Sequence, residues 1–196
     1  MGTFALLLCG AGIVCLVVSI RDLAALMFAA AAGFWLLPFV VGGRDTPVGF
    51  EAQEEPQPAP SADFKTAGGK HLKLADFHGR VVLLNFWETS CAPCQTEIPS
   101  FDRLQALYQG DGLAIVTVSV DDTSGLALRR YFQRNGLSNL TPYLDADGMT
   151  AMAFNARRLP TTLLIDRDGN VVGSLTGATQ WDSPEALALI RHYLDS

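Results

Sequence analysis

Residues 81–99 have the sequence VVLLNFWETSCAPCQTEIP, and this stretch decides which fold to expect. Its first seven residues, 81–87, are apolar apart from one Asn, which predicts a buried strand. Cys91 and Cys94 follow, and apolar residues then recur at helical spacing. The stretch therefore predicts a strand, a turn that carries a Cys-x-x-Cys motif, and a helix over residues 92–109.

The position of the two cysteines indicates redox chemistry. At the start of a helix, unpaired amide groups and the helix dipole favour a thiolate on Cys91, and the thiolate is the form that attacks a disulfide. Cys94 lies one turn further on, close enough to form a disulfide with Cys91. A structural disulfide is one alternative. Half of a zinc site is another, but zinc needs about four ligands, and the other cysteines, Cys9 and Cys15, lie in an apolar stretch. We therefore expect no metal site.

The first 41 residues are strongly apolar. Residues 3–20 and 23–41 contain no charged side chain, and only Arg21 and Asp22 separate them. Each stretch is about long enough to cross the hydrocarbon core of a bilayer. Residues 1–41 are therefore predicted to be a transmembrane region of two spans, with one span and one interfacial stretch as the alternative. The positive-inside tendency places Arg21 in the cytoplasm and residue 42 onward outside it.

The rest of the chain divides into a linker and a domain. Residues 42–62 contain four prolines and three glutamates, a composition that favours an extended linker. Residues 63–196 alternate strands with helices, which predicts one α/β domain with a central mixed sheet flanked by helices. The further elements expected there are a hairpin at 64–72, strands at 113–120, 161–166 and 171–176, and helices at 124–135, 148–155 and 184–194.

Charge and cysteine content narrow the classes of partner. The formal net charge is −6, and the sequence has no run rich in Lys and Arg, so we expect no nucleic-acid partner. Cys91 and Cys94 are the only thiols after residue 41. In an extracytoplasmic domain, a single Cys-x-x-Cys pair serves thiol exchange rather than cross-linking.

Taken together, these segments resemble the thioredoxin superfamily, and within it the membrane-anchored TlpA/ResA-type thiol-disulfide oxidoreductases. The resemblance covers residues 63–196 and implies a thioredoxin-like fold with an extra helical segment over residues 122–157. The matching segments are VVLLNFW at 81–87, CAPC at 91–94 with Glu97-Ile98-Pro99, LPTTLLID at 159–166, and GATQWDSP at 177–184, which is closest to TlpA.

The resemblance also implies roles for single residues. Pro160 matches the cis-proline that faces the dithiol and docks extended substrates, and Leu159 is expected to line the substrate groove. The alternative for Pro160 is an ordinary trans proline that opens a strand. Glu97 matches an acid that assists proton transfer at the thiols, with a solvated helix residue as the alternative. Trp87 is assigned to the substrate side of the site, packed under the active-site turn, with plain core packing as the alternative.

Two positions depart from related patterns. Asn85 stands where thioredoxin carries a buried acid, and Ser90 stands where this family usually has Trp. Because Asn cannot act as a base, acid–base assistance must come from Glu97 or from water. The loss of the ring at Ser90 removes apolar cover from the site but leaves the dithiol intact.

The family's activity is expected to carry over as follows. The protein would be tethered to the inner membrane with its domain on the periplasmic side, and would reduce disulfide-containing client proteins. The Cys91–Cys94 disulfide would be its only cofactor. Implied clients belong to cytochrome c maturation or copper-centre assembly, and the implied electron donor is a membrane protein of the DsbD/CcdA type. A peroxiredoxin-like thiol peroxidase, suggested by Thr89, and a Sco-like copper-binding module are the alternatives.

Overall fold

The computed structural model describes residues 46–108, 110 and 112–196, together with the backbone of residues 5–8 and 16–19. The chain divides into two units, Met1–Val40 and Val41–Ser196. In the first unit, β1 (Ala5–Leu8) pairs antiparallel with β2 (Leu16–Ser19). The remainder of the two expected spans lies outside the described residues, so the two-span arrangement stays a prediction. Among the helices that are described, none has the length and apolar character needed to cross a membrane.

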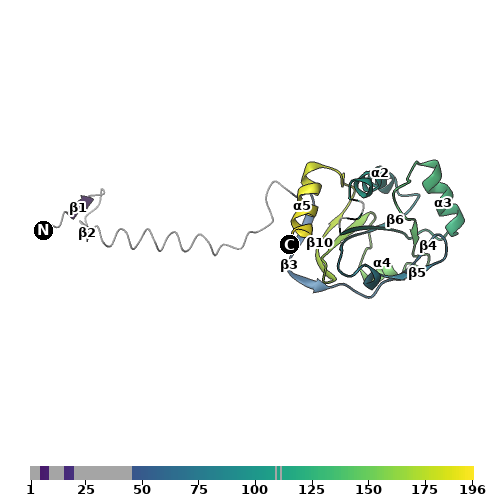
Figure 1. Cartoon of the computed structure of the whole chain (residues 1–196), viewed down its shortest axis with the longest axis horizontal. Helices are drawn as coiled ribbons and strands as arrows, with labels where there is room; N and C mark the ends of the chain where they lie inside the picture. The colour runs from purple at the N-terminus through teal and green to yellow at the C-terminus, as the bar shows by residue number, and fades with distance from the viewer. Residues whose placement is uncertain (1–4, 9–15, 20–45, 109, 111) are drawn as a thin grey trace. The chain divides into compact units, whose positions relative to one another are not determined.

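The second unit is built on a mixed sheet (Figure 1). Its strands are β3 (Phe50–Pro58), β4 (Asp63–Thr66), β5 (His71–Lys73), β6 (Val81–Trp87), β7 (Leu113–Ser119), β8 (Tyr143–Leu144), β9 (Thr161–Ile165) and β10 (Asn170–Thr176). Within the described part of the chain, these eight strands have the order β3-β10-β9-β6-β7-β8-β4-β5. β7 runs parallel to β6 and β8, and the other neighbours are antiparallel.

Helices lie on both faces of the sheet (Figure 1). They are the short 3-10 helix η2 (Leu74–Phe77), α2 (Ala92–Leu107), α3 (Gly125–Arg134), α4 (Met149–Ala153) and α5 (Pro184–Leu194). Helices α2, α3, α4 and α5 lie where the sequence predicts them, with small shifts at their ends. The expected α/β fold with a mixed sheet flanked by helices is therefore confirmed.

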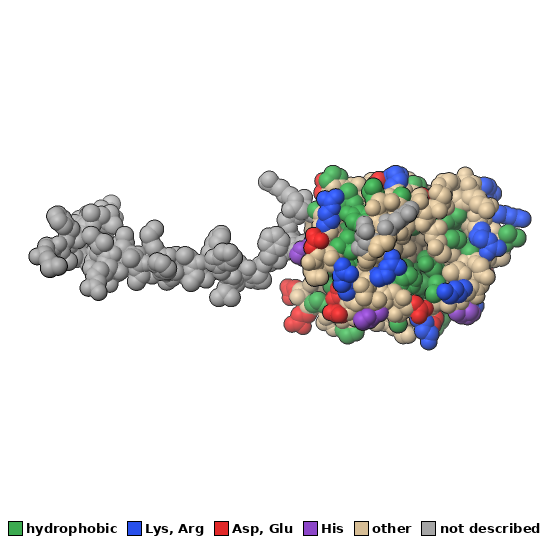
Figure 2. Space-filling model, in the orientation of Figure 1, with side chains coloured by type: hydrophobic (Ala, Val, Ile, Leu, Met, Phe, Trp, Pro, Cys, Tyr) green, Lys and Arg blue, Asp and Glu red, His purple; other side chains and the backbone are tan. Residues whose placement is uncertain are grey.

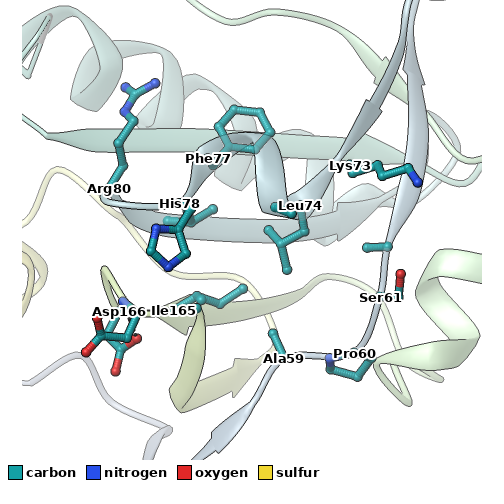
Figure 3. A pocket seen from close by; sticks show the side chains of 15 residues that line it. Ala59, Pro60, Ser61, Lys73, Leu74, Phe77, His78, Arg80, Ile165 and Asp166 are labelled. Atoms are coloured by element: carbon teal, nitrogen blue, oxygen red, sulfur yellow. Dashed lines mark hydrogen bonds between the residues drawn. The ribbon is translucent and has the colours of Figure 1, made fainter.

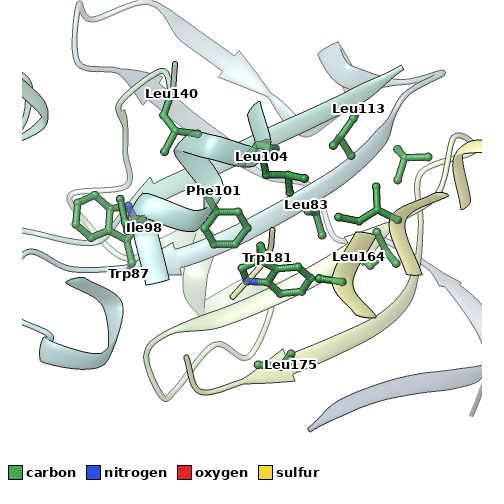
Figure 4. Close-up of a cluster of buried hydrophobic side chains, with 14 of the residues drawn as sticks. Leu83, Trp87, Ile98, Phe101, Leu104, Leu113, Leu140, Leu164, Leu175 and Trp181 are labelled. Carbon is green, nitrogen blue, oxygen red and sulfur yellow. The ribbon is translucent and has the colours of Figure 1, made fainter. Parts of the chain in front are cut away.

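The central strand β6 separates two hydrophobic clusters. All seven of its residues are buried, as expected for a strand covered on both faces. One cluster joins Leu83 to side chains of α2, α3 and α5, and Figure 4 shows Phe101 of α2 lying against Trp181 within it. The other cluster joins Leu84 to Phe154 beside α4 and to the β4–η2 region. The strand therefore carries the active-site turn on a support that is packed from both sides.

The predicted linker of residues 42–62 requires a correction, because Phe50–Pro58 within it form a strand of the sheet. β3 pairs antiparallel with β10. The ring of Phe50 packs over Gly173, where a Cβ atom would collide with it. Eight of the nine residues of β3 are exposed, and edge strands tolerate charged residues and proline. The same composition therefore suits a linker and an edge strand, and composition alone could not separate them.

On the face shown in Figure 2, basic side chains are scattered among acidic and apolar ones rather than gathered into one continuous patch. This agrees with the absence of a Lys- and Arg-rich run in the sequence.

Candidate active site

The Cys-x-x-Cys motif lies where β6 passes into α2. Cys91 is the N-cap residue of α2, and its Sγ accepts a hydrogen bond from the Cys94 amide at 3.2 Å. The two sulfur atoms form a disulfide. Cys94 is fully buried, whereas Cys91 is half-buried. Of the two sulfur-bearing side chains, Cys91 is therefore the one that an incoming disulfide can approach.

The predicted cis-proline is confirmed, since the Leu159–Pro160 peptide bond is cis. Thr161 pairs with Phe86 across β9 and β6. Pro160, one residue earlier, therefore lies at the end of β6 from which the chain turns toward the cysteines. Leu159 is half-buried and packs against both hydrophobic clusters.

The side chain of Glu97 is fully buried on α2, so the alternative of a solvated helix residue is wrong. Its Oε1 accepts hydrogen bonds from the Trp181 indole at 2.8 Å and from the Thr179 amide at 3.2 Å. Its Oε2 accepts one from Nδ2 of Asn85 at 3.1 Å. Burial raises the pKa of this carboxyl from 4.5 to about 7, although the three hydrogen bonds oppose the shift. A group with this pKa can both take and give a proton near neutral pH.

Asn85 cannot be a base, as expected, but it does have a place in the site. Its Nδ2 donates both to Glu97 and to Oγ1 of Thr162, its partner on β9. Its Oδ1 is buried and has no hydrogen-bond partner among the described residues. Asn85 therefore helps to fix the position of the Glu97 carboxyl group.

Sequence analysis missed Trp181 and Thr179 as partners of Glu97. Both lie in the segment GATQWDSP, which drew attention only through its resemblance to TlpA. The one available signal was a Trp followed by the helix-capping sequence Ser183-Pro184. That signal places Trp181 close to a helix start but does not identify its partner.

Trp87 lies in the core and not at the substrate surface. Its side chain is fully buried and packs against Tyr131 and Phe132, with ring centroids 5.5 and 6.0 Å apart. These contacts are the plain core packing given as the alternative, and not contact with a substrate. Ser90, by contrast, is exposed and donates a hydrogen bond to Oε1 of Glu88 at 2.9 Å.

Two of the hollows on the domain lie near opposite ends of β6. One, of about 300 Å³, flanks α2 on the side of α3 and is lined by Gln95, Ile98 and Tyr131 among others. The other, of about 230 Å³, lies at the end of β6 remote from the cysteines (Figure 3). It is lined by Leu74, His78 and Ile165 among others, and none of the predicted site residues contributes to it. Within the described ranges, no group of three or more His, Cys, Asp or Glu side chains is arranged to hold a metal ion.

The chain is similar to known proteins over much of its length. The AhpC/TSA family matches residues 56–174. The thiol-disulfide oxidoreductase ResA of Bacillus subtilis is 32% identical over 152 residues, which cover 78% of this chain and 80% of ResA. ResA of Geobacillus thermodenitrificans is 34% identical over 134 residues, with 68% of this chain and 76% of the relative covered.

Solved structures give the same result. A thiol:disulfide interchange protein DsbE of Chlorobium tepidum superposes with a TM-score of 0.63 at 29% identity, covering 74% of this chain and all of that one. These comparisons identify the chain as an oxidoreductase with a thioredoxin-like fold. The chain belongs to the AhpC/TSA family and, within it, to the ResA-type thiol-disulfide oxidoreductases.

Proposed function

We propose that this protein is a membrane-tethered, extracytoplasmic thiol-disulfide oxidoreductase that reduces disulfides in client proteins. The observation that carries the proposal is the unequal exposure of the two cysteines. Cys91 is accessible at the N-terminus of α2, and Cys94 is buried behind it. This arrangement suits a first thiol that attacks and a second that resolves the mixed disulfide.

The reaction consists of two exchanges. The Cys91 thiolate attacks one sulfur of the client disulfide, a mixed disulfide forms, and the other client sulfur leaves as a thiolate that takes up a proton. Cys94 then loses its proton and attacks the Cys91 sulfur. The second client sulfur leaves as a thiolate and is protonated in turn. Two electrons pass to the client, and Cys91–Cys94 is left as the oxidised disulfide.

Glu97 is the group proposed to receive the proton of Cys94. It lies one turn further along α2, is buried, and has a pKa of about 7. Its carboxylate form accepts a proton near neutral pH, and its acid form returns one to solvent or to a thiolate. No other cofactor is proposed, because the dithiol itself carries the electrons.

The cellular setting is part of the same proposal. The apolar stretches 3–20 and 23–41 would anchor the chain in the inner membrane, and Arg21 on the cytoplasmic side would place the domain in the periplasm. The oxidised domain would be reduced again by a membrane electron donor of the DsbD/CcdA type. Proteins of cytochrome c maturation or copper-centre assembly are the proposed clients, with cell redox homeostasis as the wider role.

A thiol peroxidase is the second candidate that the family permits. Such an enzyme would use the Thr89 hydroxyl close to Cys91. In this structure that hydroxyl donates to Oδ1 of Asp121 at 2.8 Å. The hydrogen bond directs Thr89 away from the role of activating a peroxide and favours disulfide exchange. Peroxide consumption, and titration with copper for the Sco-like alternative, separate these activities from disulfide reduction.

The test is a trapping experiment with the full chain. Cys94→Ser leaves Cys91 able to attack but removes the resolving thiol, so a client should accumulate as a mixed disulfide that mass spectrometry identifies. Cys91→Ser is the matched control and should trap no client. A Cys94→Ser protein that forms no mixed disulfide, together with a parent that consumes peroxide, would overturn the proposal.

A further inference from the structure

The turn between β6 and α2 is held by hydrogen bonds that the reaction above does not use. Its middle residue, Thr89, donates its amide to Oδ1 and Oδ2 of Asp121 at 3.2 and 3.0 Å, and its hydroxyl to Oδ1 at 2.8 Å. The Thr89 carbonyl accepts a hydrogen bond from Nε2 of Gln95 on α2 at 2.6 Å. The amide, hydroxyl and carbonyl of Thr89 are all engaged. We call Asp121, Thr89 and Gln95 the Thr89 clamp.

The clamp is anchored in the centre of the sheet. Asp121 follows the end of β7, where Ser119 donates its hydroxyl to Oδ2 of Asp121 at 2.5 Å and accepts the Asp121 amide at 3.2 Å. Ser119 pairs with Trp87 of β6, and the Val120 amide donates to the Trp87 carbonyl at 2.9 Å. Asp121 is therefore fixed to the end of β7, which pairs with β6, and it gives the turn a rigid support.

We propose that Asp121 is a positioning residue for the dithiol, which acts through Thr89 to hold Cys91 at the N-terminus of α2 while the disulfide is open. This inference rests on the proposed role of Cys91 as the attacking thiol. In the oxidised protein, the disulfide itself ties Cys91 to α2. Reduction removes that covalent tie, and the position of Cys91 then depends on the turn that precedes it and on the hydrogen bond that the Gln95 amide donates to the Cys91 carbonyl at 3.1 Å.

The turn has few other supports. The Cys91 amide donates to the Glu88 carbonyl at 3.3 Å, and the hydroxyl of the exposed Ser90 donates to the half-buried Glu88 side chain. If the turn shifts, the Cys91 sulfur moves away from the Cys94 amide, whose hydrogen bond favours the thiolate. Asp121 is therefore expected to keep Cys91 reactive in the reduced state, with little effect on the oxidised state.

The charge of Asp121 and its positioning role predict opposite effects of its removal on the reactivity of Cys91. A carboxylate near a thiolate disfavours it, so removal of the charge alone would raise the reactivity of Cys91. Loss of position would lower that reactivity. Asp121→Asn keeps Oδ1 as the acceptor for the Thr89 hydroxyl and amide and can donate its own amide to the Ser119 hydroxyl, but it loses the acceptor at Oδ2, so it keeps most of the clamp without the charge. Asp121→Ala removes both.

The experiment measures alkylation of the reduced full chain, purified in detergent, as a function of pH, with the modified cysteine identified by fragmentation mass spectrometry. In Asp121→Ala, we expect the midpoint of Cys91 alkylation to move to higher pH and the rate at pH 7 to fall roughly fivefold, the scale of one lost helix-terminus interaction. Asp121→Asn should react at least as fast as the parent. Thr89→Val, which loses only the hydroxyl donor, should show a smaller loss.

Asp102→Ala is the matched control for a purely structural effect. Asp102 also holds a loop, since its carboxylate accepts from the Asn139 and Leu140 amides at 2.9 and 3.2 Å. Its removal should lower the thermal midpoint without altering Cys91 alkylation. The inference is overturned if Asp121→Ala alkylates like the parent, or if Asp121→Asn is as slow as Asp121→Ala. If Asp121→Ala fails to fold, a Thr89→Val protein that alkylates like the parent overturns it equally. A parent whose Cys91 is not the more reactive thiol would instead refute the proposed attack.

Discussion

The indole nitrogen of Trp181 donates a 2.8 Å hydrogen bond to Oε1 of Glu97, across 84 residues of chain. The Trp181 ring also stacks on Phe101, with ring centroids 5.4 Å apart, and its side chain is fully buried. One side chain therefore both fills the core beside α2 and fixes the carboxyl group one turn beyond Cys94. This relationship makes the protonation of Glu97 sensitive to packing, and the first three predictions concern it.

The first prediction is that ionisation of Glu97 lowers the stability of the oxidised protein. The carboxyl has an ordinary pKa of 4.5 and a pKa of about 7 in the folded protein. Below pH 4.5, Glu97 is protonated in both the folded and the unfolded protein. Between pH 4.5 and about 7, it is protonated only in the folded protein. Stability therefore falls as pH rises from about 4.5 to 7, by on the order of 3 kcal/mol at most. Glu97→Gln should remove this slope.

Urea unfolding of the oxidised parent and of Glu97→Gln at pH 5 and pH 8 measures the effect. The free energy of unfolding of the parent minus that of Glu97→Gln should be smaller at pH 8 than at pH 5. The exposed Glu55 on β3 supplies a control, and Glu55→Gln should follow the parent at both values. Identical pH dependence in parent and Glu97→Gln would show that Glu97 titrates as an ordinary glutamate.

The second prediction concerns the rates of the two exchange steps. Glu97→Gln keeps the shape of the side chain but can neither take a proton nor carry a charge. The resolving step, in which Cys94 must lose its proton, should slow by roughly tenfold or more, while the first attack by Cys91 changes less. Above pH 7, where Glu97 is ionised, loss of its charge should also shift thiol alkylation to lower pH.

Stopped-flow exchange with a model disulfide, followed from pH 5 to 9, resolves the two steps. In the parent, the resolving rate should rise through about pH 7 as the carboxylate forms. The variant should lack this rise and still close its disulfide. Unchanged rates for both steps would remove Glu97 from the reaction.

The third prediction is that Trp181→Phe shifts the pH profile of the resolving step to higher pH. Phenylalanine keeps a ring for stacking on Phe101 but has no N–H group for Glu97. Because that hydrogen bond lowers the pKa of the carboxyl more than the other two do, its loss should raise the pKa further above 4.5. Loss of a hydrogen bond to a charged group should also cost about 1–3 kcal/mol of stability. A profile that coincides with the parent's would mean that the indole does not tune the acid.

The fourth prediction compares two truncations. Removal of residues 1–42 should leave a folded, redox-active domain, because β3 and the whole sheet remain. Removal of residues 1–62 also deletes β3, exposes the edge of β10 and takes away Phe50, and should cost about 2 kcal/mol or more. Urea unfolding and insulin reduction with added dithiol test both chains. Equal stability of the two would show that β3 contributes nothing to the domain.

Much of the fold could be predicted from sequence because its signals are local. The apolar run 81–87, the helical spacing after Cys94 and the Ser183-Pro184 helix start each depend on residues a few positions apart. The cis form of Pro160 could be assigned because its short Leu-Pro-Thr-Thr context carries the resemblance to the family's cis-proline. β3 could not, because an exposed edge strand has the polar, proline-containing composition of a linker, and only its pairing with β10 distinguishes it.

The sequence by itself determined the dithiol, the order of strands and helices around it, and the presence of an acid one turn after Cys94. Tertiary structure alone decided the pKa of that acid. Glu97 acquires a pKa of about 7 because β6, α2 and the segment before α5 enclose it and supply its three donors. The Thr89 clamp arises in the same way, since Asp121 reaches the active-site turn only because β6 and β7 lie side by side. Burial and long-range hydrogen bonds depend on which elements pack together, and residue order along the chain does not record that packing.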